Sequence, residues 1–284
     1  VRAFESMHSA DARICHDPYA RHFVSDGLQM ATDLHSALTQ QISDWENRFP
    51  GICGAVAART RFIDDCLAAA IGEGLQQLVI LGAGYDTRAM RFEGLKKNVA
   101  VFELDHPATQ KIKRQRCRSI QAAFPERIVF VPIRFGEQDL GRTLYDHGYR
   151  SARKSFFIWE GMSYYLPAAV VEDTLAFVSG CAAEGSSIVF DYVSPAVVRG
   201  ASRLAEATAL AAALKHLGEP IVFGTDPGDI EQFLGNRGLA LVRNWTAAEC
   251  RRRYLAGVNR QRRLSAMFFF AHAKVTHQRT LQPD

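Results

Sequence analysis

The chain lacks the features that mark disulfide-bonded, metal-binding and membrane-spanning proteins. Its six cysteines are scattered, without a CxxC pair or metal-ligand spacing, so we expect neither structural disulfides nor a metal site. No apolar run approaches the roughly 20 residues that a membrane-spanning helix needs. Charged and polar residues interrupt residues 1–30 throughout, unlike a secretory signal. These absences predict a soluble, cytoplasmic protein without a membrane partner.

An excess of charge of one sign is also missing. Lys and Arg number 34 against 30 acidic residues, and the net charge of +4 is too small to predict a nucleic-acid partner. The chain has no internal repeat, low-complexity tract or flexible linker. With 284 residues, 48% of them hydrophobic, it can bury one large core, and we expect a single domain over residues 1–284.

Strand and helix signals alternate along the chain, which predicts an α/β fold with a mostly parallel, helix-flanked sheet. Strands are expected at 77–81, 99–104, 127–132, 155–160, 186–193, 238–243 and 266–274. Helices are expected at 55–72, 106–123, 138–147, 168–180 and 227–236.

Two helical additions accompany this pattern. Residues 1–50 read as helices broken at Asp17-Pro18 and Phe49-Pro50. An insert at 195–218 reads as one long alanine-rich helix, from Arg199 to Leu217.

The most informative segment follows the first predicted strand. The apolar run there leads into Gly82-Ala83-Gly84, and small residues let the backbone approach a bulky cofactor at the end of a buried strand. The next apolar run carries Glu103 and ends at Asp105, where an acid can hydrogen-bond ribose hydroxyls. Together the two segments predict a nucleoside cofactor.

The turn lacks the third glycine of the dinucleotide fingerprint. Thr87 stands in that place and Asp86 precedes it. An aspartate would repel a pyrophosphate but would favour the cationic sulfonium and amino group of S-adenosyl-L-methionine. We therefore favour a methyltransferase, with a nicotinamide-dependent oxidoreductase as the alternative.

Further motifs occur in a fixed order around this turn. They are Asp17-Pro18-Tyr19-Ala20, Arg59-Thr60-Arg61-Phe62-Ile63-Asp64, Leu81-Gly82-Ala83-Gly84-Tyr85-Asp86-Thr87-Arg88, Phe102-Glu103-Leu104-Asp105-His106-Pro107 and Glu160-Gly161-Met162-Ser163-Tyr164-Tyr165-Leu166-Pro167. This set resembles the leucine carboxyl methyltransferase superfamily over roughly residues 4 to 274. The resemblance implies a class I methyltransferase fold: a Rossmann-like seven-stranded sheet with an antiparallel last strand, under an N-terminal helical lid formed by residues 1–50. It also implies S-adenosyl-L-methionine as cofactor, but it does not fix the substrate.

The resemblance assigns cofactor roles to several residues. Arg59 matches the arginine that binds the methionine carboxylate, which a guanidinium can hold through two parallel hydrogen bonds. Gly82 and Gly84 match the glycines beneath the methionine part. Asp105 matches the ribose-binding acid, with Glu103 as a second acid on the same side of the strand.

Other residues are expected nearer to the reacting groups. By resemblance, Glu160 contacts the cofactor near the methionine amino group, and Tyr165 lies beside the transferring methyl group. From their positions, Tyr19 in the lid, and Tyr192 and Arg199 beside the insert, are predicted to contact the acceptor.

One position departs from the family pattern. Arg134 stands after the third strand, where the family usually carries an aspartate that accepts a hydrogen bond from adenine. Arginine has no acceptor, so adenine must be recognised by backbone groups or by Glu137 or Asp139. This departure motivates a second hypothesis, a non-catalytic relative that binds the cofactor.

No convincing general base accompanies the motifs, because His16, His22 and His106 read as surface or packing residues. A carboxylate acceptor, with a pKa of about 4, is ionised at neutral pH and needs no base, whereas a phenol, near 10, usually does. We therefore expect an O-methyltransferase that acts on a carboxylate-bearing acceptor, either a small, polyketide-like metabolite or a protein C-terminus. A hydroxyl acceptor is the alternative.

Arginines cluster between the last two predicted strands, with Glu249 the only nearby acid. They are Arg243, Arg251, Arg252, Arg253, Arg260, Arg262 and Arg263. The cluster either steers an anionic acceptor or forms a solvated helix face.

Overall fold

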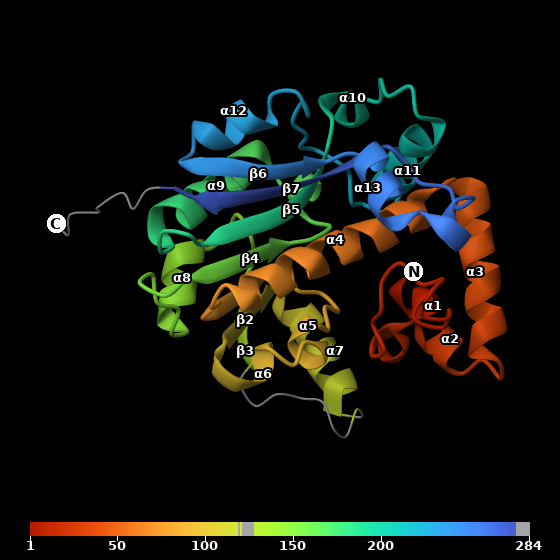
Figure 1. Ribbon diagram of the computed structural model, residues 1–284, viewed down its shortest axis with the longest axis horizontal. Coiled ribbons are helices and arrows are strands. Elements are labelled where there is room, and N and C mark those ends of the chain that lie inside the picture. The colour runs from red at the N-terminus through yellow and green to blue at the C-terminus, as the bar shows by residue number, and fades with distance from the viewer. Residues whose placement is uncertain (119, 121–127, 277–284) are drawn as a thin grey trace.

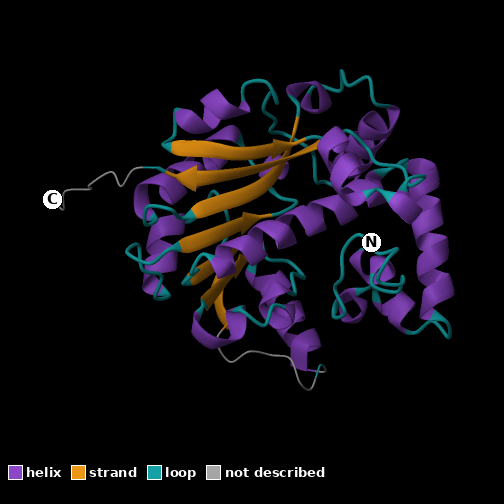
Figure 2. Cartoon of the chain, viewed as in Figure 1, coloured by secondary structure: helices purple, strands orange, loops and turns teal. Residues whose placement is uncertain are grey.

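The computed structural model of the protein describes residues 1–118, 120 and 128–276, and a seven-stranded sheet lies at its centre (Figures 1 and 2). The strand order is β3-β2-β1-β4-β5-β7-β6. Strands β1 to β5 pair in parallel, and β7 runs antiparallel to both β5 and β6. The strands are β1 (Gln77–Leu81), β2 (Ala100–Asp105), β3 (Ile128–Pro132), β4 (Ser155–Trp159), β5 (Ser187–Val193), β6 (Leu239–Trp245) and β7 (Phe268–Val275). The predicted fold class is thus confirmed.

Each predicted strand is present, and its ends shift by no more than two residues. Residue 127, the first residue of the predicted third strand, lies outside the described residues. Strands β1, β4 and β5 are buried along their whole length, as expected for parallel strands covered on both faces. Their continuous apolar runs made them easy to locate in the sequence.

Helices cover both faces of the sheet (Figure 1). One face carries α4 (Ile52–Gly72), α5 (Arg88–Arg91), α6 (Leu95–Asn98), α7 (Pro107–Arg118), α10 (Pro195–Val198), α11 (Ala205–His216) and α13 (Ala247–Tyr254). The other carries α8 (Leu140–Asp146), α9 (Ala168–Cys181) and α12 (Ile230–Gly235).

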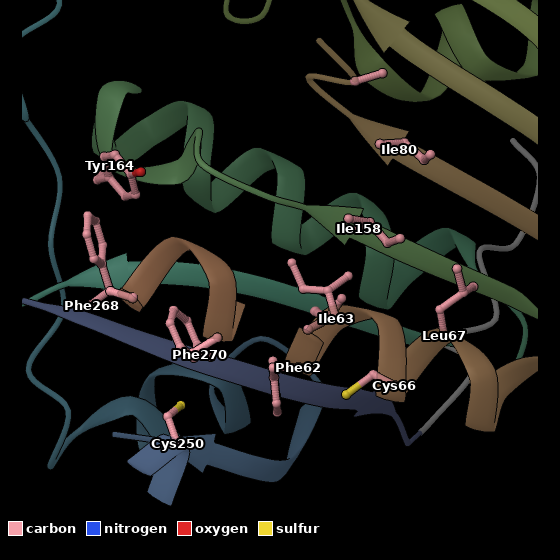
Figure 3. Packing of buried hydrophobic residues seen from close by; sticks show 14 of the residues in the cluster. Phe62, Ile63, Cys66, Leu67, Ile80, Ile158, Tyr164, Cys250, Phe268 and Phe270 are labelled. Atoms are coloured by element: carbon pink, nitrogen blue, oxygen red, sulfur yellow. The ribbon is translucent and has the colours of Figure 1, made fainter. Parts of the chain in front are cut away.

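The core on the first face is built around α4. Phe62, Ile63 and Leu67 of this helix belong to one buried cluster with Ile80 and Ile158 of the central strands (Figure 3). Burying a Leu, Ile or Phe side chain contributes about 1.5–3 kcal/mol, so this contact holds the long helix firmly across the sheet. It therefore fixes the position of polar residues that α4 presents at the sheet's carboxyl edge.

The N-terminal residues lie at the carboxyl ends of the parallel strands (Figure 1). They form α1 (Arg2–Glu5), η1 (Ala20–Phe23), α2 (Asp26–Gln29) and α3 (Leu34–Arg48). The last of these helices ends just before the predicted break at Phe49-Pro50. The buried Asp17 carboxylate accepts hydrogen bonds from the backbone of Ala20 (3.1 Å) and from the Thr87 hydroxyl (2.7 Å). This contact joins the N-terminal segment to the glycine turn.

Two helix predictions need comment. The helix predicted at 106–123 corresponds to α7; residues 119 and 121–123 lie outside the described residues. The helix predicted from Arg199 to Leu217 is confirmed as α11 but begins only at Ala205, because the chain is non-helical after α10, with Gly200 at φ +66°. Within the described ranges, no helix is both long and apolar enough to cross a bilayer.

Candidate cofactor-binding site

Strand β1 ends in a turn that depends on glycine at two positions. Gly82 (φ +67°) and Gly84 (φ +45°) both have left-handed backbone conformations. Between them, the Ala83 N–H donates to the Leu104 carbonyl (2.8 Å), which holds the turn against β2. A Cβ on Gly82 would overlap the Met162 sulfur, whereas one on Gly84 would meet no atom closer than 3.9 Å. Gly82 is therefore required for packing, and Gly84 keeps the space beside the turn open.

A cavity of about 300 Å³ lies beside this turn. It is located at the carboxyl ends of β1 and β4, where the strand order reverses and open α/β sheets bind their ligands. The lining residues are Arg2, Val56, Arg59, Ile80, Gly82, Ala83, Gly84, Tyr85, Asp86, Glu160 and Gly161. Larger hollows of about 620 Å³ lie beside α7 and between α8 and α9, away from the glycine turn.

The cavity brings together most of the predicted cofactor contacts, although they come from segments far apart in sequence. These are Arg59, Gly82, Ala83, Gly84, Asp86 and Glu160.

Arg59 reaches the cavity from α4 and lies between two carboxylates. Its Nε donates to Glu160 Oε1 (3.1 Å), and its Nη1 donates to Asp191 Oδ2 (2.6 Å). The other Asp191 oxygen accepts from the Gly161 backbone N–H (2.6 Å). Burial acts to lower the pKa of Arg59, but Asp191 and Glu160 outweigh burial and raise the pKa above its ordinary value. Arg59 is therefore a fixed cation in the cavity wall.

Arg88 lies behind the cavity and is fully buried. Its Nε donates to Asp64 Oδ1 (2.8 Å), and its Nη1 donates to Glu160 Oε2 (2.7 Å) and to Asp86. Burial opposes the ionisation of Glu160, but the guanidinium groups of Arg88 and Arg59 outweigh it and hold the pKa of Glu160 well below its usual range. Glu160 is therefore a permanent negative charge beside the cavity.

Asp105 lies at the end of β2, next to the glycine turn. Its carboxylate accepts from the Gly84 N–H and from the His106 N–H (2.6 Å). The side chain is partly exposed at the carboxyl edge of the sheet. The geometry is compatible with the predicted ribose contact.

Glu103 is placed differently from the prediction. Its side chain is 1% exposed and pairs with Lys113 Nζ of α7 at 2.6 Å. Burial raises the pKa of Glu103 despite this ammonium. Because α7 covers it, the Glu103 carboxylate is not presented to the cavity. Of the two predicted ribose acids, Asp105 is the one that contacts the glycine turn.

Tyr165 and its neighbour Tyr164 follow β4 on the short helix η2 (Ser163–Tyr165). Their ring centroids lie 4.6 Å apart. Burial raises the pKa of Tyr165 to about 12, and it raises that of the more buried Tyr164 well above its ordinary value. Both phenols are therefore hydrogen-bond donors rather than bases at neutral pH.

The three predicted acceptor contacts occupy different environments. Tyr19 packs half-buried against the cluster containing Phe23. Tyr192 is fully buried on the face of the sheet opposite α4, where its hydroxyl donates to Asn244 Oδ1 (3.0 Å). Arg199 lies exposed at the end of α10. The structure does not bring these residues together.

Arg134, the residue that replaces the expected adenine-binding aspartate, points into solvent. Its side chain is 56% exposed and approaches Glu137 (3.7 Å) and the His106 ring (3.4 Å). Asp139, one of the substitutes considered for adenine, instead caps α8 through the Arg142 N–H (2.5 Å). Arg134 is not among the residues that line the cavity.

Sequence reasoning assigned no role to three charged residues of this site. Asp64 and Arg88 lie within the recognised motifs, so their charge was visible but their pairing was not. Asp191 could have been noticed in the sequence, because it is a single carboxylate inside the largely apolar run of β5. A charge in such a strand demands a partner, and that partner is Arg59.

Comparisons with known proteins identify the family of the chain. A family model described as leucine carboxyl methyltransferase matches residues 1–179. The Bacillus subtilis "Putative S-adenosyl-L-methionine-dependent methyltransferase YktD" is 33% identical over 186 residues, which cover 65% of this chain and 60% of that protein. A "Putative S-adenosyl-L-methionine-dependent methyltransferase" of Mycolicibacterium gilvum is 33% identical over 205 residues, which cover 70% of this chain and 65% of that protein. The matched region thus spans less than two thirds of these curated relatives.

Solved structures share the architecture. A "putative methyltransferase" from Thermobifida fusca superposes with a TM-score of 0.59 at 17% identity, covering 91% of this chain and 94% of that one. A DUF574 family protein from Streptomyces avermitilis superposes with a TM-score of 0.60 at 14% identity, covering 96% and 99%. At these identities the likeness establishes the fold alone. The family model, however, covers well over half of the 284 residues, and the chain belongs to the leucine carboxyl methyltransferase family.

Proposed function

We propose that the protein is an S-adenosyl-L-methionine-dependent O-methyltransferase that forms a methyl ester on a carboxylate. The observation that carries this proposal is the cavity at the ends of β1 and β4, where the Gly82–Gly84 turn, the Arg59 guanidinium and the Glu160 carboxylate meet. Membership of the leucine carboxyl methyltransferase family supports a carboxylate acceptor, and the names of the relatives support methyl transfer from S-adenosyl-L-methionine.

The residues around the cavity fit the proposed cofactor. Gly84 leaves space beside its Cα that a side chain would occupy. Arg59 would hold the methionine carboxylate, and Glu160 and Asp86 would favour the amino group and the sulfonium. Asp105, whose carboxylate contacts Gly84 of the turn, would accept hydrogen bonds from the ribose hydroxyls. When bound, the cofactor supplies a methyl group that is already activated by a positively charged sulfur.

The chain's own contribution is then mainly positioning. Holding two reactants in line can supply about 7–11 kcal/mol of the barrier, and the buried charge network gives the cavity fixed walls. Tyr165 is proposed to lie near the transferred methyl group, where an aromatic face would attract the cationic centre by about 0.5–2 kcal/mol.

The absence of a base from the cavity lining favours a carboxylate acceptor. Of the described residues, no histidine lines the cavity. The pKa of Glu160 is held well below its usual range by Arg88 and Arg59, against the effect of burial, so Glu160 is a poor proton acceptor. An acceptor that is ionised by itself at neutral pH requires no proton removal. A small, polyketide-like carboxylate and a protein C-terminus both meet this requirement.

Calorimetry with S-adenosylhomocysteine tests the cofactor part of the proposal. Gly84→Val would place a side chain in the open space beside the turn and strain a left-handed backbone, so binding is expected to be lost. Gly74→Val, which introduces the same side chain at a left-handed glycine (φ +82°) before β1 and outside the cavity lining, is the control and should bind like wild type. Wild-type affinity in Gly84→Val would contradict the proposal.

The acceptor part needs a chemical readout. A cell extract incubated with the protein and methyl-labelled S-adenosyl-L-methionine is expected to yield a labelled product whose methyl group is released by mild alkali, as esters are. A label that survives alkali would indicate the alternative, a hydroxyl acceptor. Tight cofactor binding without a product from any acceptor would favour the non-catalytic relative that Arg134 motivated.

A further inference from the structure

Asp191 is a fully buried carboxylate on the side of β5 that faces α4. In the sheet it lies next to the segment that follows β4, because Trp159 is paired with Phe190. Its two oxygens have different partners: Oδ2 accepts from Arg59 Nη1 and Oδ1 from the Gly161 N–H, both at 2.6 Å. Burying a carboxylate has a large desolvation cost, which its cationic partner and its backbone partner must offset.

These bonds restrict Arg59 while leaving part of it free. A guanidinium has five N–H donors, and Glu160 and Asp191 engage Nε and Nη1. Among the described residues, no carboxylate bonds to Nη2; the Tyr164 hydroxyl also lies beside this guanidinium, and Arg59 lines the cavity. The two carboxylates therefore fix the plane of the guanidinium and leave donors available for a third anion.

Gly161 completes the arrangement. A Cβ at this position (φ +68°) would lie 3.3 Å from Arg59 Nη1 and 3.4 Å from Nη2, so the guanidinium rests directly on the Gly161 backbone. Asp191 binds both groups: one of its oxygens accepts from the Arg59 guanidinium, and the other accepts from the Gly161 backbone N–H. Asp191 is the only described acid that bonds to both.

We propose that Asp191 is a positioning residue that aims Arg59 at the carboxylate of the cofactor's amino-acid end. The inference rests on the proposed function, since it presumes that this cavity takes a methionine-type ligand. Asp191 makes no contact with the cofactor in this account; it acts through Arg59, as supporting side chains do when they hold a binding group in its productive geometry.

Two ligands separate positioning from a general structural role. S-adenosylhomocysteine carries the amino-acid carboxylate, whereas 5′-methylthioadenosine shares its adenosine and thioether but lacks the amino-acid end. In Asp191→Asn, the amide can still accept from Gly161 but cannot neutralise Arg59. The affinity for S-adenosylhomocysteine is expected to fall about 10- to 100-fold, while that for 5′-methylthioadenosine changes less than about twofold.

Tyr192→Phe is the matched control, because it alters the neighbouring buried residue of β5 on the opposite face. It should leave both affinities unchanged. In an Arg59→Gln background, Asp191→Asn should cause no further loss of S-adenosylhomocysteine affinity, since the residue that Asp191 positions is already gone.

The outcomes are distinct. Equal losses for both ligands in Asp191→Asn, or no loss for either, would overturn the inference, as would an additional loss in the Arg59→Gln background. If wild-type protein binds neither ligand, the proposed function itself fails. Should Asp191→Asn not fold, Asp191→Glu keeps the charge but displaces it by one methylene, and the same selective loss of S-adenosylhomocysteine affinity is expected.

Discussion

Two glutamates on this sheet, the partly buried Glu160 and the fully buried Glu103, have pKa values displaced in opposite directions. Glu160, after β4, and Glu103, in β2, both experience burial as the largest influence. Glu160 is flanked by the guanidinium groups of Arg88 and Arg59, and its pKa falls well below the usual range. Glu103 has one ammonium, Lys113, and a second oxygen without a partner among the described atoms, and its pKa rises.

The difference distinguishes a binding region from a packing region. Around the cavity, Arg59 and Arg88 each bond to more than one carboxylate. Together they lower the pKa of Glu160, although burial still raises the pKa of Asp191 despite Arg59. Among the described residues, some of their donors bond to no carboxylate, and these remain free for a ligand. Beneath α7 the pairing is one to one, with neither member in the cavity wall. A charge network with unused donors at a cavity edge is therefore better evidence for a site than a closed buried pair.

Removing the shared cation should have the largest effect. Arg88→Met leaves Asp64, Asp86 and Glu160 without a fully buried guanidinium, and the free energy of unfolding is expected to fall by about 3–5 kcal/mol. Urea denaturation measures this loss. Arg61→Met, which breaks an exposed pair with Asp65, is the control and should cost less than about 1 kcal/mol. Similar losses in the two variants would contradict the comparison.

Neutralising each of the two acids of β2 in turn should have different effects on the affinity for S-adenosylhomocysteine. Asp105→Asn is expected to weaken S-adenosylhomocysteine binding about 10- to 100-fold, because the ribose acid is lost. Glu103→Gln should change it less than about twofold, since Lys113 and not the cavity is its neighbour. Titration calorimetry of both variants checks this, and a larger effect from Glu103→Gln would reverse the assignment.

Breaking the closed pair should affect stability without affecting binding. Lys113→Met leaves Glu103 buried without its cation, but Glu103 can respond by taking up a proton, so we expect a loss of about 1–3 kcal/mol at neutral pH. Adding Glu103→Gln should recover part of that loss. A changed S-adenosylhomocysteine affinity in folded Lys113→Met would show that the two regions are coupled.

The smallest expected effect concerns the pH dependence of the free energy of unfolding, to which the two glutamates should contribute with opposite signs. Glu103 has a raised pKa in the folded protein, so its contribution to stability decreases as pH rises through that pKa. Glu160 has a lowered pKa, so its contribution is present at neutral pH and is lost as pH falls below the usual carboxyl range. Each slope is at most about 1.4 kcal/mol per pH unit. Denaturation of Glu103→Gln and Glu160→Gln against wild type between pH 3 and 7, a window that extends below the usual carboxyl range, measures both signs, and equal signs would refute the contrast.

Much of the fold and part of the site could be predicted from local sequence. The apolar runs bounded by glycine located the strands, and the Gly82–Gly84 turn located the cavity. The helix predicted from Arg199 to Leu217 is present, but its start was placed six residues too early because the alanine-rich composition hid the non-helical stretch that begins near Gly200. Local patterns report what a segment favours, and a single left-handed glycine can override that preference.

The side of the sheet to which a residue points was harder to predict from the sequence. Strand β5 is buried on both faces, so no alternation of polar and apolar residues reveals which side chains face α4. Tyr192, predicted as an acceptor contact, faces away from α4, whereas its neighbour Asp191, to which the sequence analysis assigned no role, faces α4 and binds Arg59. Glu103 does lie on the same side as Asp105, but only the tertiary position of Lys113 shows that it is covered.

A crystal structure with S-adenosylhomocysteine tests the central claim most directly, namely that the cavity between the ends of β1 and β4 is a binding site for a sulfur-linked nucleoside. The account predicts ligand density in that cavity, with the amino-acid carboxylate bonded to Arg59 and the ribose hydroxyls bonded to Asp105. Density for the ligand elsewhere on the protein, or a nicotinamide dinucleotide occupying this cavity in its place, would contradict it.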